Sequence, residues 1–200
     1  MLSFLLLCFM LNSNNLITQN ENVIIDCNYT FEEAISNLDF PDVTKYDLKL
    51  VTVLYYSFDD KIHQGQLVIH KNLVKDVIKI FSLIKEKKFK ISKVVPIVFY
   101  NWSDEKSMLG NNTSAFNYRF IAGTKRLSNH ATGRAIDINP FLNPQVFKDR
   151  TYPSTAKYNP KKEGTITADL FLVKEFKKIG WAWGGEWESS KDYQHFEKLK

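Results

Sequence analysis

A carboxylate lies inside a short apolar strand, and this constrains the fold of the whole chain. Residues 135–138 read Ala-Ile-Asp-Ile and alternate as a half-buried strand does. An ionised carboxylate is costly to bury without a partner, so the fold must bring donors or cations to Asp137. His130 precedes Asp137 by seven residues, and Gly133 lies between them. A glycine there allows the chain to turn back, so that the histidine and the aspartate can face one point.

A second histidine, close to the C-terminus, extends this pair. His195 is one of four histidines in the chain, and Asp192 stands three residues before it. Two imidazoles and one carboxylate make a three-ligand site with an open position, which is typical of catalytic zinc. Spacing alone equally allows a hydrogen-bonded structural His–Asp pair. The remaining histidines, His63 and His70, match no motif, and we expect them to be structural or exposed.

Short strands and two helices are predicted around these residues. Alternation and β-branched residues predict strands at 47–56, 65–70, 94–100, 117–123 and 134–139. A helix at 72–88 should begin at Asn72. Its apolar face carries Val74, Val77, Ile78, Phe81 and Ile84. A second helix, at about 168–179, should begin after Thr167 and end at Gly180. This mixture indicates an α+β fold: one domain with a small mixed or antiparallel sheet and flanking helices.

The segment between the last strand and the last helix differs in composition. Four of the six prolines of the chain lie in residues 140–166, and no periodicity is visible there. A loop of this length inside a compact domain is usually functional or disordered.

The 200-residue chain is long enough for one domain with a sizeable core. Residues 1–20 contain an apolar run of about ten residues, which is shorter than the ~20 needed for a membrane span. The run fits a secretory signal, although no basic residue precedes it, or a short anchor. We expect residues 21–44 to form a polar leader and residues 45–200 to form the domain. With Cys8 and Cys27 as the only cysteines, neither a disulfide framework nor a cysteine-rich zinc site is expected.

The positive charge of the chain is concentrated in the predicted domain. Residues 45–200 carry all 27 Lys and Arg residues but only 16 of the 22 acidic residues, a net charge of +11. Such a surface suits an anionic partner, which could be nucleic acid, a membrane surface or an acidic polymer such as a cell wall, or it is simply a solvated lysine-rich surface. The run KEKKFKISK (85–93) has one aromatic residue and no arginine, which disfavours nucleic-acid binding.

Longer motifs resemble one family. The Ser-x-His-x-x-Gly-x-Ala-x-Asp pattern of 128–137, with the later Asp-x-x-His of 192–195, resembles the M15 family of zinc peptidases. These are D-alanyl-D-alanine carboxypeptidases, dipeptidases and L-alanyl-D-glutamate endopeptidases that cut peptidoglycan stem peptides. The resemblance extends to NNTSAFNYR (111–119), which is similar to the segment that carries the active-site arginine of the family. It also extends to WGGEW (183–187) and HFE (195–197), and so covers most of the chain.

The resemblance implies a role for several residues. His130, Asp137 and His195 match the ligands of one zinc ion per chain. Asp192 matches the catalytic base; many members have Glu there, and Asp is typical of the endopeptidase-like branch. Arg119 matches the arginine that steadies the reacting carbonyl or a substrate carboxylate. The simpler alternatives are orientation of a ligand histidine for Asp192 and a surface ion pair for Arg119.

Other residues are expected around the cleft. Ser128 is a candidate for contact with the substrate. Glu197 should lie beside a ligand histidine or in the substrate cleft. The loop at 140–166 should border the cleft and help to select the substrate. Three tryptophans either line the cleft or pack in the core: Trp181, Trp183 and Trp187.

The resemblance therefore implies a zinc-dependent peptidase that acts on peptidoglycan stem peptides in cell-wall remodelling. Both D-Ala-D-Ala carboxypeptidase and L-Ala-D-Glu endopeptidase activity remain open. We expect a monomer that is secreted or in the cell envelope, without a nucleic-acid partner and with membrane attachment only through the N-terminus. The alternative is a non-catalytic, zinc-stabilised module that binds cell wall or protein, because hedgehog signalling domains share the fold without needing peptide hydrolysis.

Overall fold

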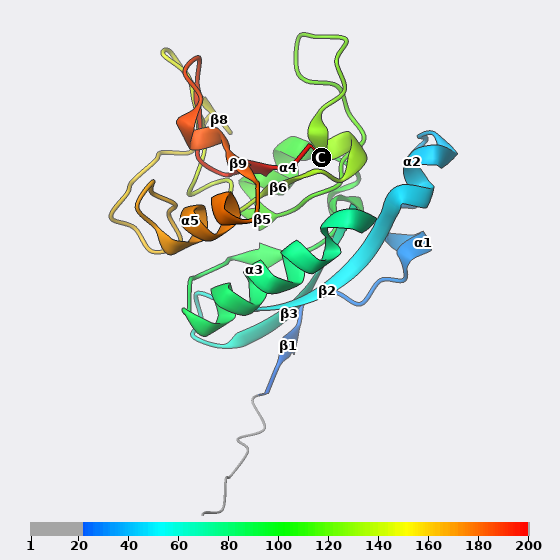
Figure 1. Cartoon of the computed structure of the whole chain (residues 1–200), viewed down its shortest axis with the longest axis horizontal. Helices are drawn as coiled ribbons and strands as arrows, with labels where there is room; N and C mark the ends of the chain where they lie inside the picture. Colours follow the sequence, from blue (N-terminus) through cyan, green and yellow to red (C-terminus); the bar gives the residue numbers. More distant parts are fainter. Residues whose placement is uncertain (1–21, 200) are drawn as a thin grey trace, which may run out of the picture.

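The computed structural model describes residues 22–199 (Figure 1). The predicted signal or anchor at residues 1–20 lies outside this range. Helices and short strands alternate along the described chain in one small domain, which confirms the predicted α+β class. No helix within residues 22–199 has the length and apolar character needed to cross a membrane.

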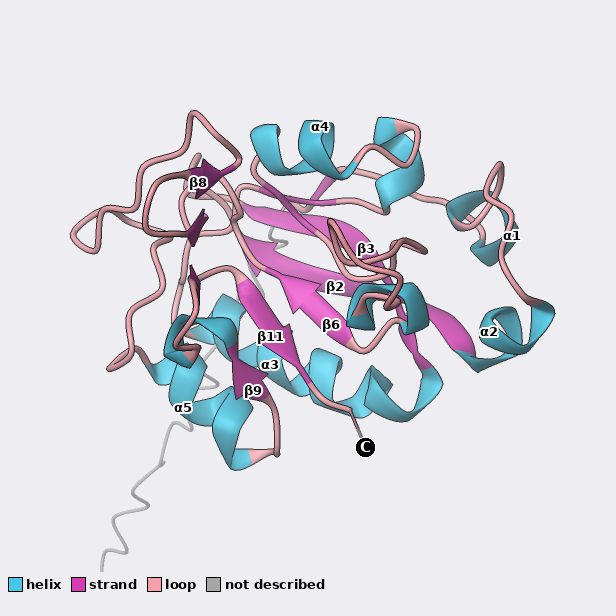
Figure 2. Cartoon of the chain, turned by 90° about the horizontal axis from the view of Figure 1, so that it is seen from above, coloured by secondary structure: helices cyan, strands magenta, loops and turns pink. Residues whose placement is uncertain are grey.

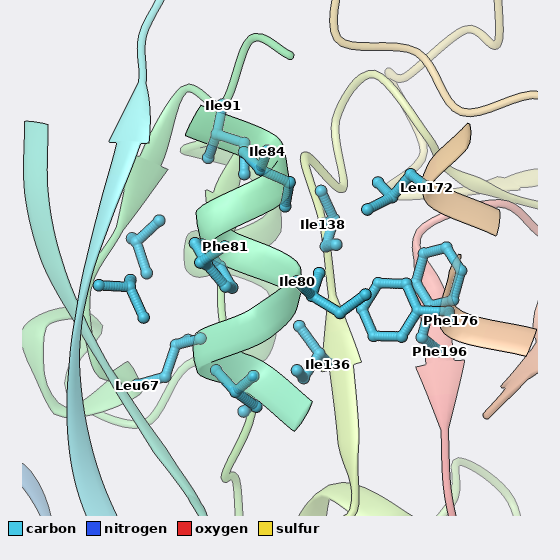
Figure 3. Packing of buried hydrophobic residues seen from close by; sticks show 14 of the residues in the cluster. Leu67, Ile80, Phe81, Ile84, Ile91, Ile136, Ile138, Leu172, Phe176 and Phe196 are labelled. Carbon is cyan, nitrogen blue, oxygen red and sulfur yellow. The ribbon is translucent and has the colours of Figure 1, made fainter. Parts of the chain in front are cut away.

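A long hairpin and one helix form the first half of the core. Strands β2 (Leu48–Tyr56) and β3 (Ile62–His70) are antiparallel and pair along their full length. Both contain the alternating β-branched and aromatic residues that favour strands, so the predictions at 47–56 and 65–70 are confirmed. Helix α3 (Val74–Glu86) follows β3 after the 3-10 turn Lys71–Leu73 and packs against the hairpin (Figures 1 and 3).

The second half of the core is built from the C-terminal part of the chain. Strands β6 (Ala135–Asp137), β11 (His195–Glu197) and β9 (Ala182–Trp183) form an antiparallel sheet in the order β6-β11-β9 (Figure 2). Helix α5 (Phe171–Lys178) packs beside this sheet. Between the two halves, α3 directs Phe81 toward the hairpin and Ile80 toward Phe176 and Phe196 (Figure 3).

A separate small sheet involves the proline-rich segment. Strands β7 (Gln145–Val146) and β8 (Thr151–Tyr152) pair with each other, and β7 also pairs with β10 (Lys191–Asp192). The 3-10 turn Gly184–Glu186 connects β9 to the segment that leads into β10. Residues 140–166 therefore contain short strands within a mostly irregular segment.

The segment before the hairpin also packs on the domain. Strand β1 (Ile24–Ile25) pairs in parallel with β3, and helices α1 (Phe31–Ala34) and α2 (Asp42–Asp47) follow. Ala34 and Ile35 are buried in a second apolar cluster with Leu48, Val68 and Phe116. The predicted domain boundary at residue 45 stays a prediction.

Two predicted strands are wrong. At 94–100 only the first residue belongs to a strand, β4 (Lys93–Val94), which pairs with β5 (Asn112–Thr113). Pro96 lacks the amide hydrogen that a ladder needs and instead begins the 3-10 turn Ile97–Tyr100, after which comes α4 (Asp104–Leu109). Residues 117–123 form no strand; a single bridge joins Phe120 to Leu127.

The helix boundaries also differ from the prediction. Asn72 does not cap α3: it lies inside the preceding 3-10 turn, and its amide donates to Nδ1 of His70. Helix α5 begins later than predicted, and the Thr167 hydroxyl donates to Asp169. The predicted stop is confirmed, since Gly180 adopts a φ of +85° just after α5.

The orientation of α3 gives a test of the core. Ile80 is 1% exposed, whereas Ile78, predicted on the buried face, is 50% exposed. We expect Ile80→Ala to lower the free energy of unfolding by about 2–5 kcal/mol, through lost burial and an unfilled cavity. The matched change Ile78→Ala should cost less than about 1 kcal/mol. Chemical denaturation measures both, and equal losses would contradict this packing.

Candidate metal centre

Pairing of two strands brings Asp137 and His195 together. Asp137 is the last residue of β6, His195 is the first residue of β11, and the antiparallel register places them directly opposite. The apolar neighbours of Asp137 point into the core, so the carboxylate leaves the strand on the other face. Its Oδ1 lies 3.0 Å from Nδ1 of His195.

A tight turn brings His130 to the same point. The 3-10 turn Asn129–Thr132 carries His130 and ends at Gly133, whose φ is +65°. A side chain at Gly133 would also lie 2.7 Å from the backbone nitrogen of His70, so this position requires glycine. The turn places Nε2 of His130 3.2 Å from Asp137 Oδ2 and 3.3 Å from Nδ1 of His195.

In each histidine, the ring nitrogen that points away from Asp137, here called the outward nitrogen, is hydrogen-bonded to a neighbouring group. Nδ1 of His130 lies 2.5 Å from the carbonyl oxygen of Ala115, and Nε2 of His195 lies 3.0 Å from Oε2 of Glu197. Glu197 in turn accepts a hydrogen bond of 2.5 Å from the side-chain amide of Asn129. With hydrogens on the outward nitrogens, the inward nitrogens of both rings present lone pairs toward Asp137. Metal-ligating histidines are typically held in this way.

Together these three residues form a group that could hold a metal ion. Their candidate ligand atoms all lie within 4.8 Å of one another. The exposed fractions are 3% for His130 and 7% for both Asp137 and His195. Two imidazole nitrogens and a carboxylate oxygen are suitable ligands for zinc and related divalent ions.

The electrostatics of the group favour a bound positive charge. Burial opposes the ionised form of Asp137. The interactions with His130 and His195 outweigh this effect of burial, so the pKa of Asp137 is lowered. Burial likewise opposes a charged His195, yet its hydrogen bonds to Asp137 and Glu197 raise the pKa of His195 to about 10. The carboxylates therefore attract a cation to this point, which a proton or a metal ion can supply.

Asp192 lies close by on another strand. It belongs to β10, is 9% exposed, and its Oδ1 has no hydrogen-bond partner within residues 22–199. Burial raises the pKa of Asp192 to about 7. An added Cβ on Gly184 would lie 2.7 Å from the carbonyl oxygen of Asp192 and 3.2 Å from Cβ of His195. The turn at Gly184 thus packs directly against both residues.

Arg119 lies on the segment that runs beside the His130 turn. The carbonyl of Arg119 accepts from the Ser128 amide at 3.0 Å, and the Asn117 amide donates to the His130 carbonyl at 3.1 Å. The Arg119 guanidinium pairs with Asp104 at 3.1 Å, and its side chain is 32% exposed. Among the described residues it makes no hydrogen bond or ion pair with the three-residue group. Its predicted role in catalysis stays a prediction.

The other candidates have mainly structural surroundings. The buried hydroxyl of Ser128 accepts a hydrogen bond from the His130 amide, and so caps the turn. Glu197 lies beside His195, one of its two predicted locations. The ring of Trp187 lies 5.1 Å from the ring of His195, whereas two tryptophans are buried in the core: Trp181 and Trp183.

The two remaining histidines are held by neighbouring side chains. His63 lies between the carboxylates of Asp26 and Asp59, and His70 contacts the Arg134 guanidinium.

Sequence reasoning did not find Asn129. This residue orients Glu197 and thereby His195. Its only signal was its place between Ser128 and His130, inside the motif. The contact spans 68 residues, so nothing local to Asn129 reveals it.

The fold and this group define an α+β protein with a buried two-histidine, one-carboxylate site that could hold a metal ion. Residues 122–198 match the family model described as D-alanyl-D-alanine carboxypeptidase. The match confirms the resemblance of this part of the chain to the M15 peptidases and supports a peptidase, that is, a hydrolase. It includes the three candidate ligands and Asp192 but begins after Arg119. No curated protein and no solved structure matches the chain.

The contact between Glu197 and His195 predicts an effect on metal affinity. Removing the carboxylate in Glu197→Ala frees the outward nitrogen of His195, and we expect Zn²⁺ affinity to fall by about 10–100-fold. The control Glu186→Ala removes an exposed carboxylate that pairs with Lys177 and should leave the affinity unchanged. Competition with a chromophoric chelator measures both. Unchanged affinity in Glu197→Ala would show that this hydrogen bond does not support the metal centre.

Proposed function

We propose that this chain is a zinc-dependent peptidase that hydrolyses peptide bonds of peptidoglycan stem peptides, secreted or in the cell envelope. The observation that carries the proposal is the pair of inward-facing imidazole nitrogens beside Asp137, together with the buried carboxylate of Asp192 on β10, whose Oδ1 has no hydrogen-bond partner among residues 22–199. All four residues lie in the segment that matches the peptidase family.

The ligand set fits zinc. His130, Asp137 and His195 would hold the ion through two nitrogens and one oxygen, which leaves a coordination position open. A zinc ion bound in this way supplies Lewis acidity and lowers the pKa of a water molecule to ~7. Glu197 and the Ala115 carbonyl keep both histidines in the tautomer that the metal requires.

Asp192 is assigned the role of general base. Its side chain is buried, so its charged form is less stabilised by water and its basicity is higher than that of an exposed aspartate. Oδ1 has no hydrogen-bond partner among residues 22–199 and is thus free to accept a proton from the attacking water. The same oxygen can then deliver that proton to the leaving amine.

Arg119 is assigned to the reacting carbonyl or to a carboxylate of the substrate, on the family resemblance. Asp104 holds its guanidinium at 3.1 Å and Asn117 donates to the other oxygen of Asp104. This pair fixes Arg119 beside the segment that leads into His130. A planar guanidinium suits either partner, because its forked donors can bind both oxygens of a carboxylate or donate together to one carbonyl oxygen.

Carboxypeptidase and endopeptidase activity need the same metal and base. The description of the matched family favours removal of a terminal D-Ala, whereas an aspartate at position 192 favours the endopeptidase-like branch. Digestion of purified muropeptides, followed by product masses, separates the two: loss of D-Ala indicates the first, and cleavage after L-Ala indicates the second. Absence of both products, with zinc bound, would favour the binding-module alternative.

Metal content is the first test. Purified protein should contain about one zinc per chain, and His130→Ala should lose most of it because only two ligands remain. The control His63→Ala removes a histidine that contacts Asp26 and Asp59, and should retain the metal. Elemental analysis after dialysis measures this. Full zinc content in both His130→Ala and His195→Ala would exclude the proposed site.

Hydrolysis by Asp192 variants is the second test. Asp192→Asn keeps the shape of the side chain but removes its basicity, so we expect hydrolysis to fall by ~10²–10⁴-fold while zinc stays bound. Asp60→Asn, the same change at an exposed aspartate paired with Lys90 and outside residues 140–166, should hydrolyse at the parent rate.

The assay follows stem-peptide cleavage, with zinc measured on the same samples. Parent activity in Asp192→Asn would show that another group is the base. Loss of zinc would instead place Asp192 among the ligands.

A further inference from the structure

The proline-rich segment holds the backbone of Asp192. In the β10-β7-β8 sheet, Asp192 lies opposite Gln145 and Lys191 lies opposite Val146. The side-chain amide of Gln145 also donates to the Ser190 hydroxyl at 3.1 Å. Strand β10, which carries the candidate base, therefore belongs to the same sheet as β7 and β8 of the proline-rich segment. It is not part of the sheet that carries Asp137 and His195.

A second contact reaches the residue after Asp192. The ring of Tyr158 stacks on the ring of Tyr193, with centroids 3.7 Å apart and an angle of 5° between the planes. On the other side, the indole nitrogen of Trp183 donates to the Tyr193 carbonyl at 3.0 Å. Tyr193 is thus held between the proline-rich segment and the core.

The segment itself is fixed at its base. The side chain of Asn143 donates to the Gly164 carbonyl at 3.0 Å and accepts from the Ile166 amide at 2.7 Å. The Tyr158 hydroxyl donates to the Ile166 carbonyl at 2.8 Å. Asn143 is fully buried, so these bonds are shielded from water. The two ends of the segment are joined, and Tyr158 is tied to the joined end.

We propose that residues 140–166 form a frame that positions Asp192, and that Tyr158 is a positioning residue acting through Tyr193. The inference rests on the proposed role of Asp192 as base. Oδ1 of Asp192 has no partner within the described chain, so that oxygen contributes nothing to fixing the carboxylate. A hydrogen bond with the side chain of Gln194 acts on the carboxylate, and its position otherwise depends on the backbone of Asp192, which pairs with β7 and contacts the turn at Gly184. The Tyr158–Tyr193 stack prevents this strand from shifting along its length.

Loss of the stack should affect proton transfer more than substrate binding. Misplacement of a catalytic group by about 1 Å can cost ~10²-fold in rate. We therefore expect Tyr158→Ala to lower kcat by about 10–100-fold with KM changed less than about threefold. Zinc content should stay at the parent value, because none of the three candidate ligands belongs to the frame.

Two variants separate the stack from other effects. Tyr158→Phe keeps the ring but loses the hydroxyl bond to Ile166, and should restore kcat to within about threefold of the parent. Phe171→Ala removes another aromatic contact, with Phe89, which follows α3; neither residue belongs to the β10-β7-β8 sheet. It should lower stability without lowering kcat. If Tyr158→Ala does not fold, Tyr158→Leu replaces it, since leucine fills the space without offering a flat ring.

A measurement independent of activity tests the same frame. Amide hydrogen exchange of a peptide covering residues 188–194 should become faster in Tyr158→Ala and remain at the parent rate in Tyr158→Phe and Phe171→Ala. Unchanged exchange together with unchanged kcat in Tyr158→Ala overturns the proposal. An equal loss of kcat in the alanine and phenylalanine variants also overturns it, because the stack would then not be the cause. If the parent protein cleaves no stem peptide, the proposed function fails, and the exchange result alone decides whether the frame exists.

Discussion

The pairing of β6 with β11 is the constraint on which the rest of the structure depends. It places a carboxylate opposite an imidazole inside a sheet whose other face is fully apolar. A buried charge of this kind is tolerated only with compensating partners, and His130 and His195 both approach Asp137 within about hydrogen-bond distance. The tight turn at Gly133 and the hydrogen bonds of Glu197 follow from that requirement, because both imidazoles must present the correct nitrogen.

Helix α3 packs against this strand pair in the core. Phe81 faces the hairpin and Ile80 faces the C-terminal sheet, so one helix is packed on two sides (Figure 3). Ile136 and Ile138, the neighbours of Asp137, belong to the same apolar cluster. The candidate ligand is therefore carried by a strand whose alternate residues are anchored in the core. Sites built on such strands hold their geometry better than sites built on loops.

The sequence predicted well what local patterns determine. The hairpin strands and β6 follow from alternation, and the three candidate ligands follow from a motif with fixed spacing. Prediction failed where contacts with distant residues determine the structure. Residues 117–123 have strand-like composition but form only one bridge. On α3, Ile80 rather than Ile78 faces the C-terminal sheet. The hydrogen bond from Asn129 to Glu197 joins segments far apart in the chain. No local pattern carries such information, because both residues are ordinary polar residues until the fold brings them together.

The candidate ligands and the candidate base belong to different sheets. Asp137 and His195 lie in the β6-β11-β9 sheet, whereas Asp192 lies in the β10-β7-β8 sheet, and only Tyr193 and Gln194 separate the two strands. The first sheet is anchored by the apolar core, and the second by the proline-rich segment, through its pairing with β7 and the Tyr158–Tyr193 stack. In the proposed mechanism, metal retention and proton transfer therefore depend on different parts of the molecule. In that mechanism, a change in residues 140–166 alters the placement of the proposed base while the metal group stays intact, so substrate selection by this segment would act on the rate.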